Sequence, residues 1–135
     1  MNLEELENKL PNGFHDAQLI NINIDYSNQK AVLDINLWTG DLDAKESELR
    51  ETWRHGKLTI NKLLFCVIEP PDSNYHYIES GPVNIDGGPM KALSSPPKIP
   101  LPNPLPKDAF VHWFYVSDWN AFIYIAGMDA QFDWQ

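Results

Sequence analysis

The chain has 135 residues, of which 43% are hydrophobic, and it carries one cysteine and a formal net charge of −9. This length and hydrophobic content predict one domain over residues 1–135, with a core that needs no disulfide or metal ion. The negative charge would repel the phosphates of nucleic acids, and no apolar run approaches the ~20 residues that cross a bilayer. We therefore expect neither nucleic acid nor membrane as a partner.

Two features of the sequence point to the cytoplasm. The first residues contain neither the basic nor the apolar region of a secretion signal. Cys66 has no second cysteine to pair with, and it lies in an apolar run where we expect a buried and unreactive thiol. From these features we expect a cytoplasmic protein of a prokaryotic cell.

The first predicted elements are a short helix and a hairpin. Leucines at helical spacing predict a helix over residues 3–9, which Asn2 can cap in a pattern resembling a capping box with Glu5. Alternation of apolar and polar residues predicts strands over residues 17–25 and 30–38, joined by a turn. On the first strand, the isoleucines predicted to share the buried face are Ile20, Ile22 and Ile24.

The middle of the chain gives weaker signals. Residues 40–54 fit both a helix and a charged loop, and we favour a polar loop with room for one helical turn, followed by a strand from near Thr52. Residues 58–68 predict one long strand, whose last part is apolar on both faces, as in a central strand. Residues 75–78 and 83–85 predict short edge strands.

A proline-rich segment separates these strands from the last ones. Seven of the eleven prolines lie between Pro89 and Pro106, and proline offers a sheet no backbone donor. We therefore expect residues 86–108 to form an irregular arm that crosses the surface or covers a sheet edge. Aromatic and β-branched residues then predict strands over residues 110–116, 121–126 and 130–134.

Together these elements predict a mainly β fold. Roughly six to eight strands with short turns would form an antiparallel curled sheet, either a β-roll or barrel or a two-layer sandwich, with one short N-terminal helix. No strand–helix–strand alternation occurs, so a parallel α/β fold is not expected.

The first candidate for chemistry is His15 with its neighbour Asp16. A carboxylate beside an imidazole can orient the ring or pair with its cation. Adjacent residues of an extended segment point to opposite sides, so Asp16 can equally satisfy the amides of a turn. A metal site built from this pair and a distant His76 or Glu69 lacks the spacing of a metal motif, and we expect no metal and no cofactor.

The second candidate is Trp119, which follows Asp118 in a predicted turn. An exposed tryptophan in a turn suits a binding surface, although the ring can equally fold back on the sheet. No serine or cysteine lies in the context of a catalytic nucleophile, so we predict no catalytic residue and favour a protein that is not an enzyme. The predicted binding residues are His15, Asp16, Glu69, Asp118 and Trp119.

Short motifs of the chain resemble those of a known group of proteins. They are Pro11-Asn12-Gly13-Phe14-His15-Asp16-Ala17 before the first strand, Ile68-Glu69-Pro70-Pro71-Asp72 after a central one, and Trp119-Asn120 leading to Phe132-Asp133-Trp134. They resemble a family of small uncharacterised bacterial β-rich proteins with an NGFHDA-type opening, of which some are grouped with immunity proteins of toxin systems. The resemblance implies a bacterial cytoplasmic protein and a hint of toxin neutralisation, and it supplies no catalytic residues.

Three functional hypotheses follow. The leading one is a non-enzymatic, immunity-like module that binds a basic protein partner through an acidic face. Its clustered acidic residues are Asp41, Asp43, Glu46, Glu48 and Glu51. The rival is a small-molecule-binding or hydrolytic β-roll, which needs His15, Asp16, Glu69 and Trp119 to meet in one pocket. The third is a homo-oligomer in which the proline-rich arm embraces a neighbouring subunit.

Overall fold

The computed structural model describes residues 1–76 and 80–135 of the chain. The strands are β1 (Ala17–Asp25), β2 (Lys30–Trp38), β3 (Trp53–Asn61), β4 (Phe65–Ile68), β5 (Val83–Pro89), β6 (Phe110–Val116), β7 (Ala121–Gly127) and β8 (Asp129–Trp134). The helices are α1 (Leu3–Glu7), α2 (Ser47–Arg50) and the single-turn helix η1 (Met90–Ala92). Among the described residues, no helix has the length and apolar composition that crossing a membrane requires.

These strands form one antiparallel sheet of eight strands in the described part of the chain, in the order β4-β7-β6-β5-β1-β2-β3-β8. The sheet is not closed, because β4 and β8 each pair with one neighbour only. The predicted fold, a mainly β antiparallel curled sheet with a short N-terminal helix, is confirmed.

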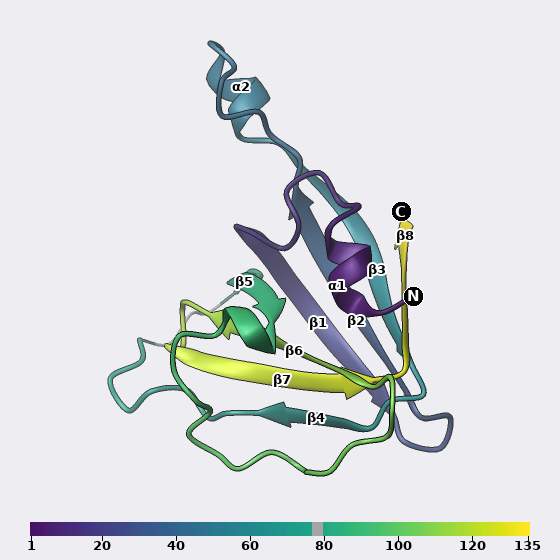
Figure 1. The fold of residues 1–135 in the computed structure, drawn as a ribbon. Helices are drawn as coiled ribbons and strands as arrows, with labels where there is room; N and C mark the ends of the chain where they lie inside the picture. The colour runs from purple at the N-terminus through teal and green to yellow at the C-terminus, as the bar shows by residue number, and fades with distance from the viewer. Residues whose placement is uncertain (77–79) are drawn as a thin grey trace.

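The two ends of the sheet meet at a corner. The amide of Leu64 donates to the carbonyl of Ala126 at 2.8 Å, and the amide of Met128 donates to the carbonyl of Asn61 at 3.4 Å. These bonds join the β3–β8 end to the β4–β7 end, so the sheet curls into a roll with two layers. Figure 1 shows β1, β2 and β3 running diagonally in one layer, while β4, β6 and β7 run across them in the other. Strand β5 joins the layers, because it pairs with β1 on one side and with β6 on the other.

The hydrophobic core lies between these layers. Along β2, buried side chains alternate with half-buried ones from Ala31 to Leu37, as the sequence predicts for a strand with one face on a core. The core residues that the two layers contribute include Leu33, Ile35, Leu58, Ile60, Ile85, Phe114, Val116, Ile123 and Ile125.

Helix α1 bridges the two layers, since it packs against β8 in one and against β5 and β6 near the other. It buries Leu3 and Leu6 in the core. As predicted, Asn2 caps it, because its Oδ1 accepts from the amide of Glu5 at 2.8 Å. The reciprocal bond runs between side chains, since Asn2 Nδ2 donates to Glu5 Oε1 at 2.9 Å. The helix ends at Glu7, two residues before the predicted end.

The predicted orientation of Ile20 is wrong. A β-bulge shifts the register between Leu19, which pairs with Ile35, and Asn21, which pairs with Asp34. Ile20 is the extra residue, and it is 47% exposed. The bulge changes the phase of alternation, so Leu19 faces the core before it and Ile22 after it.

The prediction of one long strand over residues 58–68 is also wrong. Lys62 has a φ of 51°, and this left-handed turn redirects the chain from β3 to β4, which lies in the other layer. Strand β4 is an edge of the sheet rather than a central strand. Its side chains are half-buried, except for the exposed Ile68.

Three predictions for the middle of the chain need correction or completion. Residues 40–54 form a loop with the short helix α2, and β3 begins at Trp53, close to the predicted Thr52. The strand predicted over residues 75–78 falls partly on residues 77–79, which lie outside the described residues. The edge strand predicted over residues 83–85 is longer and lies inside the sheet as β5.

The proline-rich arm therefore begins after β5 and η1, and it covers residues 93–108 rather than 86–108. Gly87 and Gly88, which were expected to belong to the irregular arm, are residues of β5 that aromatic rings approach closely. A β-carbon on Gly88 would lie 2.8 Å from the Trp113 ring, and one on Gly87 would lie 3.0 Å from the Phe114 ring. Figure 1 shows the arm passing from η1 around β7 and β4 before it enters β6. Tyr124 is only 1% exposed, although alternation places it on this outer face.

Candidate functional site

His15 and Asp16 lie together just before β1, contrary to what an extended segment would give. Asp16 has a φ of 52°, and this left-handed conformation brings its side chain back beside the imidazole. His15 Nε2 lies 3.3 Å from Asp16 Oδ2, and His15 Nδ1 lies 2.8 Å from Oδ1 of Asp86 on β5. The same Asp86 oxygen accepts a bond from the amide of Asp16 at 3.2 Å. A protonated imidazole can therefore donate to both carboxylates.

This cluster is the one group of three metal-ligating side chains found among the described residues. An imidazole offers only one ring nitrogen to a metal, and here both nitrogens of His15 face a carboxylate. All three side chains are at least 43% exposed, so water competes for each of them. The two carboxylates therefore occupy both ring nitrogens of His15, which does not suit a metal ion.

An aromatic groove of about 500 Å³ adjoins this cluster on the outer face of the second layer. Tyr115 lies opposite Asp86 on β5 and opposite Phe122 on β7, so these side chains form one row across three strands. Trp113 lies in the next row, where its Nε1 donates to the carbonyl of Pro89 at 2.9 Å and fixes the ring across Gly88. The groove is therefore lined by the Asp86 carboxylate and by aromatic rings.

Glu69 continues this row on the other side of β7. Its amide donates to the carbonyl of Phe122 at 3.0 Å, and its Oε1 accepts from the amide of Phe122 at 2.8 Å. Three strand spacings of about 4.8 Å separate Glu69 from Asp86, which puts them roughly 14 Å apart. His15 and Glu69 line two different pockets. The single convergent site that a hydrolytic β-roll requires is not assembled.

Trp119 and Asp118 occupy the β6–β7 turn, as predicted. The half-buried Trp119 ring packs against the core, so it folds back on the sheet. Asp118 Oδ2 accepts from the amide of Asn84 at 2.6 Å, which ties the turn to β5. Together with Asp72 and Asn120, both residues line an open groove of about 510 Å³. The two residues thus border a groove different from the one that contains His15.

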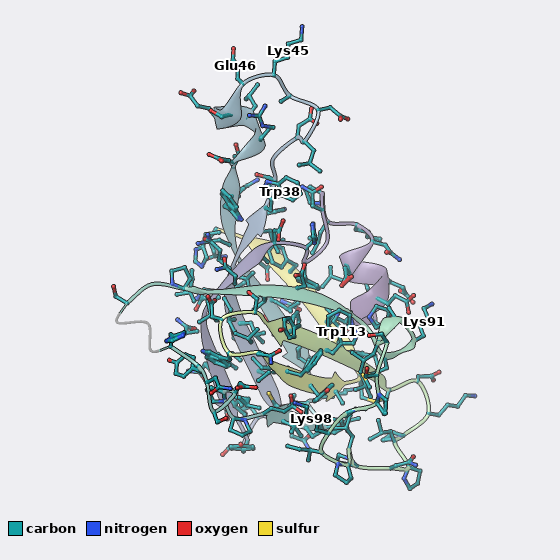
Figure 2. The ribbon with its side chains drawn as sticks, turned by 90° about the vertical axis from the view of Figure 1, so that its left-hand side faces the viewer. Trp38, Lys45, Glu46, Lys91, Lys98 and Trp113 are labelled. Atoms are coloured by element: carbon teal, nitrogen blue, oxygen red, sulfur yellow. The ribbon has the colours of Figure 1, made fainter. Side chains whose placement is uncertain are left out.

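Residues 39–52 between β2 and β3 form a projection that we call the finger. Figure 1 shows α2 standing away from both layers, and Figure 2 places Lys45 and Glu46 at the tip and Trp38 near the base. The described side chains of α2 include none that is buried. The finger therefore takes its shape from something other than a hydrophobic core.

Hydrogen bonds hold the finger in shape. Trp38 Nε1 donates to the carbonyl of Arg50 at 2.7 Å, and Arg50 Nη1 donates to the carbonyl of Ala44 at 2.8 Å. The amide of Asp41 donates to the carbonyl of Leu49 at 3.0 Å. At the base, a β-carbon on Gly40 would collide with the backbone of Arg50 and the ring of Trp38. Only glycine lets the two sides approach this closely.

The finger presents apolar and acidic side chains to solvent. Leu42 is 72% exposed and Leu49 is 56% exposed. The exposed acidic residues around them are Asp41, Asp43, Glu46, Glu48 and Glu51. The acidic cluster was visible in the sequence, whereas the ordered shape that carries the leucines was not, because it rests on bonds between residues up to 13 apart.

Cys66 lies on β4 and is half-buried rather than buried. Burial raises the pKa of its thiol from the ordinary 9.0 to about 11. Thiolate is the reactive form, so at pH 8 we expect alkylation by iodoacetamide to be about 100-fold slower in the folded protein than in the urea-unfolded chain. Mass spectrometry of the modified protein over time measures both rates, and equal rates would contradict this expectation.

The raised pKa of the Cys66 thiol also makes the stability of the fold depend on pH. The folded state disfavours the Cys66 thiolate, so the unfolded chain loses this proton first as the pH rises. Stability is therefore expected to fall above about pH 9, where the thiol of the unfolded chain ionises. A Cys66→Ala variant lacks this part of the pH dependence.

Several residues of these sites were not predicted from the sequence. Asp86 was expected to begin the irregular arm, and only the fold pairs it with Tyr115. The outward positions of Trp113 and Tyr115 could have been found, since they alternate with the buried His112 and Phe114 along β6.

Comparison with known proteins leaves the function to be inferred from these sites. The chain matches no protein-family model, no curated protein and no solved structure. The resemblance to proteins with an NGFHDA-type opening therefore rests on short motifs alone.

Proposed function

We propose that this protein is a non-enzymatic protein-binding module that engages a basic partner through the finger. One observation carries the proposal: a loop without a hydrophobic core is ordered by its own hydrogen bonds and exposes Leu42 and Leu49 among acidic side chains. The motif resemblance supports an immunity-like form of this role, in which the partner is a toxin.

The exposed leucines indicate that the finger binds a partner and does more than keep the protein in solution. Acidic side chains alone would serve solubility, whereas an apolar side chain on a projecting loop gains free energy only when a partner covers it. Apolar anchors surrounded by a polar rim are the usual arrangement at protein interfaces. A loop that is ordered before binding also loses less conformational entropy on binding.

The charge of the finger indicates the chemistry of the partner. Its acidic side chains are Asp41, Asp43, Glu46, Glu48 and Glu51, against the basic Lys45 and Arg50. The whole chain, with the finger included, has a net charge of −9. A field of this sign attracts a basic surface and accelerates its association at low salt. We therefore expect the association rate to fall as the salt concentration rises.

The experiment is affinity purification from the native cell with the double variant Leu42→Asp/Leu49→Asp. We expect the wild type to retain a stoichiometric basic protein, and the double variant to bind it at least about tenfold more weakly, because it loses both apolar anchors. The matched control is Ile20→Asp, which changes an equally exposed aliphatic residue at the β1 bulge. This control is expected to bind like the wild type.

Two outcomes would contradict the proposal. One is the absence of any stoichiometric protein partner, and the other is a partner that binds the double variant as tightly as the wild type. Gly40→Ala separates shape from chemistry, since it keeps every charge and both leucines while its β-carbon collides with Arg50. We expect this variant to bind more weakly and to be cleaved faster by trypsin at Lys45 and Arg50.

The other two hypotheses have less support. A small-molecule site near His15 and Asp16 retains the aromatic groove, but Glu69 and Trp119 do not line that groove. A homo-oligomer built by the arm stays a prediction, since no contact of the described residues bears on it.

A further inference from the structure

The aromatic groove beside Asp86 is a cavity that the proposed function does not use. Its lining comes from β5, β6 and β7, and from Ala92, Leu93 and Ser94, where η1 ends and the arm begins. Its volume of about 500 Å³ lies within the range of pockets that hold small molecules. The groove therefore has the size for a small molecule and not for a protein domain.

Three aromatic rings from two neighbouring strands line the groove at steep angles to one another. The Phe122 ring lies 5.0 Å from the Tyr115 ring with 60° between their planes, and 6.0 Å from the Trp113 ring with 75° between their planes. All three side chains are half-buried, whereas Tyr124 on the same face is buried. The rings thus offer partly open surfaces of different orientation and not one flat stack.

The polar groups of these rings already form hydrogen bonds within the protein. Trp113 Nε1 donates to the carbonyl of Pro89 at 2.9 Å, and the Tyr115 hydroxyl donates to Asn120 Oδ1 at 2.7 Å. Phe122 has no polar group in its side chain. What the three rings offer a ligand is therefore apolar contact and the negative potential of their π faces.

The Asp86 carboxylate places a negative charge beside these rings. Asp86 lies directly opposite Tyr115 in the pairing of β5 with β6. Its side chain is 43% exposed, so a ligand in the groove can reach it. Its Oδ1 accepts from the amide of Asp16 and lies 2.8 Å from His15 Nδ1. Its Oδ2 forms no hydrogen bond or ion pair with another of the described residues.

The charges around the groove favour a cation. Its described lining residues include no lysine or arginine. Lys91 on η1 is paired with Glu4 of α1 at 2.6 Å. His15 also lines the groove, but the carboxylates of Asp16 and Asp86 flank its two ring nitrogens. Two carboxylates against one imidazole keep this rim negative even when the imidazole is protonated.

The lining also indicates the kind of cation. A primary ammonium or guanidinium ion brings several N–H donors, each of which needs an acceptor, and one open carboxylate oxygen satisfies few of them. A quaternary ammonium ion has no N–H group and spreads its charge over its methyl groups. Such ions are held by aromatic faces beside a negative charge, in arrangements known as aromatic cages. Three inclined rings beside a carboxylate match this requirement.

We propose that the aromatic groove binds a small quaternary ammonium ion with a trimethylammonium head group. The methyl groups pack against Trp113, Tyr115 and Phe122, and the positive charge lies in the field of Asp86. This site goes beyond the proposed function and does not involve the tip of the finger, since Figure 2 shows Trp113 in the body of the molecule and Lys45 at the tip.

The test is a titration of ¹⁵N-labelled protein with choline, followed by the indole N–H resonance of Trp113 and the amide resonance of Gly87. We expect saturable shifts of both resonances with choline. The neutral analogue of choline, in which a carbon atom replaces the nitrogen, has the same shape without the charge. We expect no saturable shift with this analogue.

Two variants separate the charge from the rings. Asp86→Asn keeps an acceptor for the amide of Asp16 but loses the charge, and we expect it to bind choline at least about fivefold more weakly. Phe122→Leu keeps an apolar side chain but loses the π face, and we expect binding at least about threefold weaker. The matched controls Asp133→Asn and Phe132→Leu make the same changes on β8, and we expect them to bind like the wild type.

Three outcomes would overturn the proposal: no saturable shift with choline, equal shifts with the neutral analogue, or unchanged affinity in Asp86→Asn. Should Asp86→Asn fail to fold, Phe122→Leu decides, because weaker binding supports the proposal and unchanged affinity overturns it. The finger variant Leu42→Asp/Leu49→Asp is expected to bind choline like the wild type, so failure here and failure of the proposed function are distinguishable.

Discussion

Replacing Phe114 by alanine is expected to lower the free energy of unfolding by about 3–5 kcal/mol, the range for a large aromatic residue removed from a packed core. Phe114 is fully buried. Its ring meets the Phe14 ring edge to face at 5.2 Å. The space it leaves cannot collapse easily, because the backbone of Gly87 forms its other wall and is held in the sheet.

Urea denaturation followed by tryptophan fluorescence measures this loss. The matched control is Phe122→Ala on the neighbouring strand β7, which removes the same ring from the half-buried outer face. We expect a clearly smaller loss for this control. Equal losses would contradict a core located between the two layers.

Replacing Glu7 by alanine is expected to lower the free energy of unfolding by about 2–3 kcal/mol. Glu7 Oε2 lies 2.8 Å from Nε2 of His112, which is 1% exposed. This bond joins α1 to the inner face of β6. Without the carboxylate, the buried imidazole keeps a polar nitrogen that no longer has this partner, and the helix loses its link to β6.

The chain provides a matched control on the same helix. Glu4 forms an ion pair with Lys91 at 2.6 Å, and its partner's side chain is 75% exposed. Exposed pairs contribute about 0–1 kcal/mol, so Glu4→Ala is expected to change stability by no more than that. Urea denaturation of each variant measures its loss of stability. A Glu7→Ala variant as stable as Glu4→Ala would show that the bond to His112 contributes nothing.

Local patterns predicted most of the strands, because a strand with one face on a core must alternate. Apolar and polar residues alternate over most of residues 30–38, and aromatic and β-branched residues fill residues 110–116; β2 and β6 occupy these ranges. The capped helix was predictable for a similar reason, since Asn2 and Glu5 act within one turn. In each case the forces that decide the structure operate between residues close in sequence.

Predictions were wrong where distant residues decide the structure. The bulge at Ile20 depends on how β1 pairs with β2. The turn at Lys62 depends on the meeting of the two sheet ends, since Asn61 and Leu64 on either side of it bond to Met128 and Ala126. Gly87 and Gly88 were assigned to the irregular arm and not to a strand, because the rings that need their small size lie on β6, more than twenty residues away.

The candidate sites were also predictable only in part. The sequence alone determined a single mainly β domain with a strongly acidic surface, and it drew attention to His15, Asp16 and Glu69. Only the tertiary structure decided that His15 joins Asp86, and that Glu69 lies at the far end of the same row of side chains. The physical reason is that alternation determines which face a side chain takes, whereas the pairing of strands distant in sequence determines its neighbours.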